Sequence, residues 1–166
     1  MKTIWILFLH EIRMRLRHPR TFIILAFFLF LSQAAAFTVG DFLDSSEANL
    51  LPLFLYLPLI GAFLLPLLTM SQWAQPQALG ALPWLFSFPL PTWKLVVARF
   101  AVGCVLACLA LLLTLPLAAS LAYLGNPDWG MIQAGYLACF GIFLSQLALG
   151  GLASALAPHI LAAYVL

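Results

Sequence analysis

The sequence predicts an all-α fold, a polytopic bundle of transmembrane helices that begins with an amphipathic helix. Of the 166 residues, 65% are hydrophobic and only 7% are charged, whereas soluble domains carry roughly a quarter charged residues. Four apolar runs reach the length of about 20 residues that a membrane span requires. The charged residues are also distributed unequally between the ends of these runs. We therefore expect residues 1–166 to form a single membrane domain.

The charge distribution predicts the orientation of the chain. The basic residues precede the first apolar run or follow the second, and they are Lys2, Arg13, Arg15, Arg17, Arg20, Lys94 and Arg99. The acids between the first two runs and after the third are Asp41, Asp44, Glu47 and Asp128, and only Glu11 breaks the pattern. Because Lys and Arg in short loops are retained in the cytoplasm, we expect a multi-pass protein of the cell inner (cytoplasmic) membrane with a cytoplasmic N-terminus. The net charge of +2 does not indicate a nucleic-acid partner.

Residues 1–20 are expected to form an amphipathic elbow helix in the cytoplasmic interface. Apolar side chains that would be buried in the interface recur at helical spacing, at Ile4, Trp5, Phe8, Ile12 and Leu16. Arg13 and Arg17 occupy a different face, near the lipid phosphates. Pro19 is expected to end this helix, because proline disfavours the helical conformation of the residue before it.

The spans are expected at about residues 21–39, 50–70, 95–123 and 131–157. Prolines inside the second span are tolerated, since neighbouring helices and local adjustments satisfy the freed carbonyl groups, and Pro116 is expected to kink the third span. Residues 40–49 and 124–130 are expected to be external loops, and residues 71–94 to contain a short interfacial helix. A fifth apolar run begins at residues 160–166, which suggests either a fragment or a complete but degenerate protein.

The sequence contains no arrangement of residues that is typical of an enzyme. His10, His18 and His159 lie at predicted cytoplasmic boundaries, away from any acid and nucleophile within the membrane. Cys104 and Cys108 share a helix face, but packing is favoured over metal binding because no third ligand is in view. The cysteines are expected to be reduced, packed thiols. The chain is therefore expected to be non-catalytic and to bind no metal or cofactor.

Small and amide residues within the spans predict a tightly packed bundle. Small residues lie four apart in the pairs Gly103 and Ala107, Gly135 and Cys139, Gly150 and Ser154, and Gly151 and Ala155, a spacing that lets helices approach closely and is compatible with a dimer. For Gln33, Gln133 and Gln146, hydrogen bonds between helices are favoured over the lining of a translocation path. The lack of an ionisable residue at a predicted mid-membrane position argues against an ion-coupled secondary transporter.

Three segments of the chain together resemble a known family. They are HEIRMRLRHPRTF at residues 10–22, MSQWAQPQALGALPWLFSFPLPTWKLVVARF at residues 70–100, and LTLPLAASLAYLGNPDWG at residues 113–130. The first is similar to an elbow helix that proline closes, and the second keeps a pattern of Gly80, Leu82, Pro89 and Trp93. The sequence thus resembles the membrane (permease) subunit of a type-2 ATP-binding-cassette (ABC) exporter, in the gliding-motility-like permease branch.

This resemblance implies a function for the chain. In that family the permease binds no nucleotide, and a separate ABC ATPase subunit drives it through the elbow and the first cytoplasmic loop. The ATPase-docking surface implied here is Glu11, Arg13, Gln75, Gln77, Gly80 and Leu82. The resemblance also implies that a second permease subunit joins this one in the bilayer, as a homo- or heterodimer. No residue selects the substrate among lipids, polysaccharides, peptides and haem.

The chain departs from the family pattern in the first cytoplasmic loop and in its number of spans. Residues 75–78, the sequence QPQA, stand where the family has a Glu-rich, Arg-containing segment, which removes salt-bridge partners for an ATPase. Family members also have more spans than are expected here. The alternatives left open are a non-transporting or degenerate membrane scaffold and a haem-exporter-type permease of cytochrome c maturation, which the segment HEIRMRLRH suggests. An intramembrane enzyme is a more distant alternative.

Overall fold

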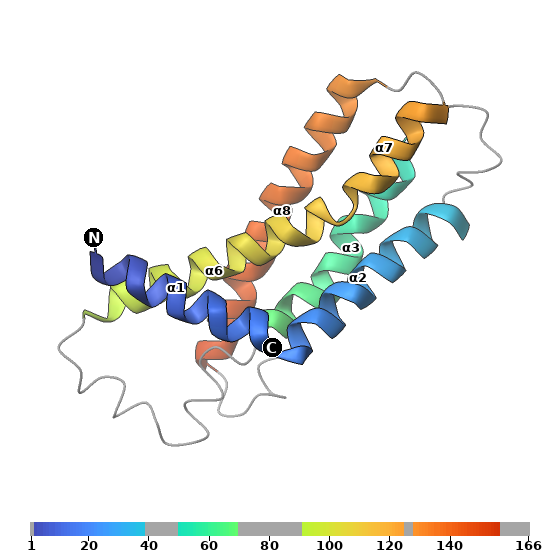
Figure 1. The fold of residues 1–166 in the computed structure, drawn as a ribbon. Coiled ribbons are helices and arrows are strands. Elements are labelled where there is room, and N and C mark those ends of the chain that lie inside the picture. The colour runs from blue at the N-terminus through green and yellow to red at the C-terminus, as the bar shows by residue number, and fades with distance from the viewer. Residues whose placement is uncertain (1, 39–49, 70–90, 125–127, 157–166) are drawn as a thin grey trace.

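The computed structural model describes residues 2–38, 50–69, 91–124 and 128–156, and in these ranges the chain is helical and contains no strand. The predicted all-α fold is therefore confirmed. The helices, drawn in Figure 1, are α1 (Lys2–Arg17), α2 (Pro19–Thr38), α3 (Leu51–Thr69), α6 (Thr92–Leu112), α7 (Leu115–Leu124) and α8 (Trp129–Leu156). The external loop expected at residues 40–49, residues 71–90 of the segment expected to contain an interfacial helix, and the start of a fifth span lie outside the described residues. Residues 92–94 of that segment begin α6.

Four helical segments are long and apolar enough to cross a membrane, at Pro19–Thr38, Leu51–Thr69, Thr92–Leu121 and Trp129–Leu156. Each begins and ends within about three residues of the range expected from hydropathy. Large apolar side chains such as Ile23, Leu55 and Leu137 point outward, each with more than 60% of its surface exposed. Contiguous apolar surface of this kind suits a lipid environment rather than water. The chain is a multi-pass membrane protein.

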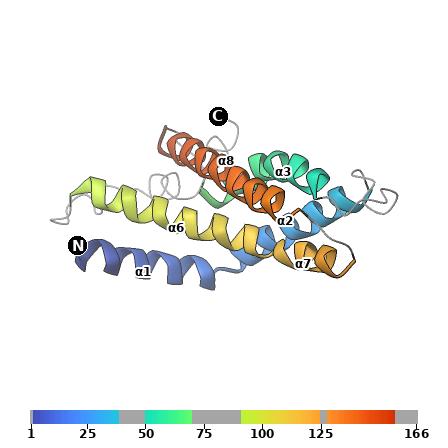
Figure 2. The same cartoon turned by 90° about the horizontal axis from the view of Figure 1, so that it is seen from above.

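The helices form a bundle in which α3 makes most of its contacts with two of the other spans. α3 packs against both α2 and α8, while α1 lies alongside the first part of α6 (Figures 1 and 2). One end of the bundle holds α1, the start of α2, the end of α3 and the start of α6, and we call it the α1 end. The opposite end holds the end of α7 and the start of α8.

Proline and aspartate set two of the helix starts. α1 ends at Arg17, His18 makes a bend, and Pro19 is the first residue of α2, a position where the missing N–H of proline costs nothing. The expected end of the first helix at Pro19 is therefore found. Asp128 caps α8, because its Oδ1 accepts hydrogen bonds from the amides of Gly130 at 2.9 Å and Met131 at 3.4 Å.

The third span is interrupted at residues 113–114, which separate α6 from α7. Pro116 has no N–H to donate to the carbonyl of Leu112, so the regular helical ladder stops there. Thr114 closes the break: its Oγ1 donates to the carbonyl of Leu111 at 2.7 Å. The Tyr136 hydroxyl of α8 then donates to the same Oγ1 at 3.2 Å. The kink expected near Pro116 is therefore present, and α8 supports it.

The interface between α3 and α8 is the most extensive in the bundle, and we call it the α3–α8 seam. Glycines allow this contact: a Cβ at Gly135 would lie 2.6 Å from the Phe54 ring, and one at Gly150 would lie 3.2 Å from the Cα of Pro66. Such distances are too short for any larger residue unless the helices move apart. The four-residue spacing of small residues thus marks a real helix contact at these positions, whereas no atom of the described residues lies within 4 Å of a Cβ placed at Gly151.

Candidate functional site at the α1 end of the bundle

α1 is fixed to the bundle by one side of the helix. Phe8, Ile12 and Leu16, which recur at a spacing of four, are half-buried and pack against the apolar core. Trp5, which was expected to be buried in the membrane interface, is 62% exposed on the protein surface and stacks on the Phe8 ring with the centroids 5.6 Å apart. The protein core therefore holds α1 from Phe8 to Leu16, and Trp5 projects beyond it.

A cluster of three charged residues joins α1 to α6. The Glu11 Oε1 lies 3.6 Å from an Nη of Arg15, one turn further along α1, and 3.6 Å from the Nε of Arg99 on α6. Arg99 is only 6% exposed, although it lies in the second turn of an apolar helix. The Glu11–Arg15–Arg99 cluster therefore places a carboxylate between two guanidinium groups at the contact between the two helices.

The same cluster reaches the end of α3. The Nη1 of Arg15 donates a hydrogen bond of 2.7 Å to the carbonyl oxygen of Leu68. Leu68 is in the last turn of α3, where backbone carbonyls have no partner within the helix and where a cation is favoured by the helix dipole. The Thr69 hydroxyl donates to the carbonyl of Pro66 at 3.0 Å in the same turn. Arg15 thus connects α1 to the point where the chain leaves the second span.

Burial strengthens these contacts. Arg15 and Glu11 retain only 15% and 23% of their side-chain exposure, so solvent screening is weaker than for a surface pair. Burial lowers the pKa of the Arg15 guanidinium, and the nearby Glu11 carboxylate offsets part of that effect. A guanidinium group stays protonated in proteins despite such shifts. The cluster is therefore an ion-paired junction of fixed charge that links α1, α3 and α6.

The structure describes two of the six residues predicted to form a docking surface. Glu11 is half-buried within the cluster, and Arg13 is exposed on α1. The two therefore differ in role: Glu11 serves an internal contact, whereas Arg13 is accessible. Gln75, Gln77, Gly80 and Leu82 lie outside the described residues, so their place in a surface stays a prediction.

Sequence reasoning missed the partners of Glu11. Glu11 was noted as an exception to the charge pattern, and Arg15 and Arg99 were counted only as markers of orientation. Two signals could have found the cluster. Glu11 and Arg15 have the i, i+4 spacing of a helical ion pair, and Arg99 falls within an apolar segment, where a charge requires a partner. A lone acid among basic residues is the natural partner.

The amide side chains within the spans behave differently from one another. The Gln146 Nε2 donates to the carbonyl of Pro58 on α3 at 2.9 Å, which is the expected bond between helices. Gln133 is exposed, and the buried Oε1 of Gln33 accepts no hydrogen bond from the part of the chain that the structure describes. Of the cysteines, Cys139 is buried and Cys108 is exposed, so the expectation of packed thiols is wrong for Cys108.

The chemistry available at the α1 end is that of charge pairing and mechanical attachment. Among the described residues, no group of three or more His, Cys, Asp or Glu side chains could hold a metal ion. Comparison of the chain with family models, with curated proteins and with solved structures finds no match.

Proposed function

We propose that this chain is the permease subunit of a type-2 ABC exporter of the gliding-motility-like branch, coupled to a separate ATPase subunit. The observation that carries the proposal is the Glu11–Arg15–Arg99 cluster, because it attaches an amphipathic helix outside the spans to two of the spans themselves. A helix attached in this way can pass a movement at the membrane surface into the bundle. The three resembling segments, residues 10–22, 70–100 and 113–130, support the same assignment.

This function requires that the chain lies in the inner membrane of the cell and that its N-terminus faces the cytoplasm. Arg13, Arg15, Arg17, Lys94 and Arg99 belong to α1 or to the first two turns of α6, and both lie at the α1 end (Figure 1). Asp128 lies at the opposite end. Because basic residues are retained in the cytoplasm, this arrangement favours an α1 end that faces the ATPase.

The proposed mechanism follows from the contacts of the cluster. When the ATPase binds ATP and closes, it would press on α1 and on residues 71–94, which lead from α3 into the start of α6. The displacement would pass from Glu11 to Arg99 on α6 and from Arg15 to Leu68 on α3. The spans would then shift between an inward and an outward opening as packed bodies. A second permease subunit would complete the path.

The test is reconstitution of the full chain with an ABC ATPase encoded beside its gene. We expect the two to co-purify and ATP hydrolysis in nanodiscs to exceed that of the ATPase alone. Glu11→Gln should reduce the stimulation while association persists, whereas Gly80→Asp or Leu82→Asp should weaken association itself. Arg20→Gln, an exposed residue at the same end, is the matched control.

Three outcomes would overturn the proposal. An ATPase that fails to associate with the chain, or one that associates without any change in hydrolysis, would instead favour a non-transporting scaffold. Labelling of Ser45→Cys by an impermeant maleimide should occur from outside intact cells, and labelling only after lysis would place the α1 end on the wrong side of the membrane for an ATPase.

A further inference from the structure

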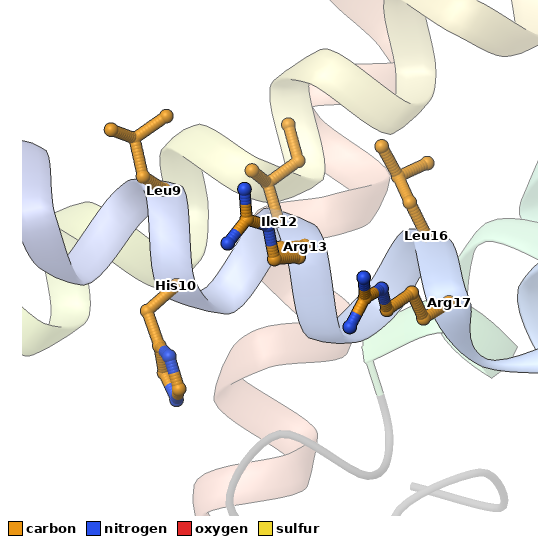
Figure 3. A pocket seen from close by; sticks show the side chains of 6 residues that line it. All are labelled: Leu9, His10, Ile12, Arg13, Leu16 and Arg17. Carbon is orange, nitrogen blue, oxygen red and sulfur yellow. The ribbon is translucent and has the colours of Figure 1, made fainter.

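One flank of α1 is hollowed at the surface (Figure 3). Among the described residues the hollow is lined by three apolar and three basic side chains, Leu9, Ile12, Leu16, His10, Arg13 and Arg17. Arg13 follows Leu9 by four residues and Arg17 follows Arg13 by four, while Leu16 lies two turns after Leu9, so a helix brings these side chains to one flank. We call this region the α1 hollow.

The basic side chains of the α1 hollow are available for a ligand. Arg13 and Arg17 lie one helical turn apart and are both exposed. Neither forms a hydrogen bond or ion pair with any residue in the described ranges. The acid of α1 does not neutralise them, because Glu11 lies on the side that faces α6 and is held between Arg15 and Arg99. The hollow therefore presents two unopposed positive charges to an anion.

The apolar side chains of the hollow restrict the kind of anion. Leu9 is 46% exposed beside Arg13, and Leu16 and Ile12 are half-buried at the bottom of the flank. A small free anion such as inorganic phosphate would gain nothing from this apolar surface. A molecule that joins an anionic group to a hydrocarbon chain would cover the leucines and pair with the arginines together.

The position of the α1 hollow along the chain further restricts the class of ligand that could bind there. Arg17 is the last residue of α1, and the first span begins at Pro19. Arg17 therefore lies within one turn of the level at which the chain enters the bilayer, where lipid phosphates are concentrated. Arginine side chains at such a boundary extend their charged ends toward the headgroups and keep their methylene groups on apolar surface.

We infer that the α1 hollow is a binding site for an anionic phospholipid, with the phosphate between Arg13 and Arg17 and the upper acyl chain along Leu9 and Leu16. The site requires only that the chain spans the membrane, so it is independent of the exporter proposal. A lipid bound there would contact the helix that carries Glu11, and it would thereby hold α1 against the bilayer surface.

The test is native mass spectrometry of the full chain, delipidated in detergent and supplied with phosphatidylglycerol or with phosphatidylcholine of the same acyl chains. We expect the wild-type chain to retain phosphatidylglycerol in preference, and the preference to fall as salt is raised. Arg13→Gln with Arg17→Gln should weaken phosphatidylglycerol binding roughly thirtyfold, since each basic residue near an anionic lipid surface contributes about a fivefold factor. Both side chains are exposed, so folding should be retained.

The matched control is Arg20→Gln with Lys94→Gln, which removes the same charge from the α1 end but lies outside the hollow. It should keep the preference. Leu9→Ser should weaken the binding of phosphatidylglycerol and leave the weak binding of glycerol phosphate, which has no acyl chain, unchanged. Equal retention of the two lipids by the wild-type chain, equal loss in both double variants, or competition by inorganic phosphate as effective as that by phosphatidylglycerol would each overturn the assignment.

Discussion

The α1 end and the α3–α8 seam hold helices together by different physical means. At the α1 end, Glu11 Oε1 is shared by Arg15 and Arg99 at 3.6 Å, beside the packing of Phe8, Ile12 and Leu16. Along the seam, Gly135 and Gly150 let α8 approach Phe54 and Pro66 so closely that a methyl group would not fit. The first contact depends on charge and direction, and the second on shape over a long interface.

The difference teaches which part of the bundle can change its arrangement. In a bilayer no hydrophobic effect drives apolar helices together, because lipid is as apolar as their side chains. Close packing at small residues therefore supplies most of the free energy of helix association. Packing of that kind fails when the helices slide. An ion-paired junction can keep its attraction while its partners shift by a fraction of a turn. We therefore expect α3 and α8 to move as one body, and α1 and α6 to adjust against it.

The largest expected effect comes from removing the shared carboxylate. Glu11→Leu leaves Arg15 and Arg99 facing each other without the negative charge between them, and breaking a buried pair in this way costs roughly 3 kcal/mol. Unfolding of the variant by SDS in mixed micelles, followed by tryptophan fluorescence, measures that loss. Arg13→Gln, on an exposed position of the same helix, should leave the midpoint unchanged.

A triple variant sharpens the same test. Glu11→Leu, Arg15→Leu and Arg99→Met together remove every charge of the cluster, and apolar replacements of a buried ion group often restore stability. We expect the triple variant to be more stable than Glu11→Leu alone. If Glu11→Leu unfolds at the same SDS midpoint as the wild-type chain, charge does not hold the α1 end together. That result would contradict the proposed difference between the α1 end and the α3–α8 seam.

The seam is tested by two neighbouring glycines. Gly150→Ala places a methyl group 3.2 Å from the Cα of Pro66, and overpacking of this kind costs roughly 2 kcal/mol. Gly151→Ala adds the same atom at a position with no described neighbour within 4 Å, so it should be neutral or slightly stabilising because alanine favours helix. The SDS midpoints of the two variants give the comparison, and equal midpoints would contradict a seam closed by Gly150.

The smallest effect is expected at the break in the third span. Tyr136→Phe removes the hydroxyl that donates to Thr114 Oγ1 at 3.2 Å, and single hydrogen bonds between membrane helices contribute about 0.6 kcal/mol. Ser145→Ala is the control, since the Ser145 hydroxyl is exposed and bonds only to the carbonyl of Ile142 on its own helix. The same SDS titration measures both variants, and Tyr136→Phe should lose more unfolding free energy than Ser145→Ala.

The sequence predicted the elements of the fold better than their contacts. The span limits follow from hydropathy, and Pro19 and Pro116 act through steric rules that do not depend on neighbours. An amphipathic pattern tells which side of a helix is apolar, but not how far along that side the bundle extends, so it did not show that Trp5 lies beyond the packed part of α1. The small-residue spacing was likewise ambiguous, since Gly150 lies in the seam and Gly151 does not.

The candidate site was predictable only in part, because its partners come from distant segments. The i, i+4 spacing of Glu11 and Arg15 is local, and it was available from the sequence. The approach of Arg99 to Glu11 across 88 positions and the bond from Arg15 to Leu68 depend on how α1 lies against α6 and α3. Nothing local to α1 encodes that placement.

The break at residues 113–114 limits how far a displacement of Arg99 can travel. α6 is a continuous helix from Thr92 to Leu112, but Pro116 removes the backbone hydrogen bond that would continue it into α7. A tilt started at Arg99 would therefore be absorbed at Thr114, where the Tyr136 hydroxyl pins the joint to α8. The two segments of the third span, α6 and α7, can therefore tilt independently of each other. One end of the bundle can then change its opening while the other end stays as it is.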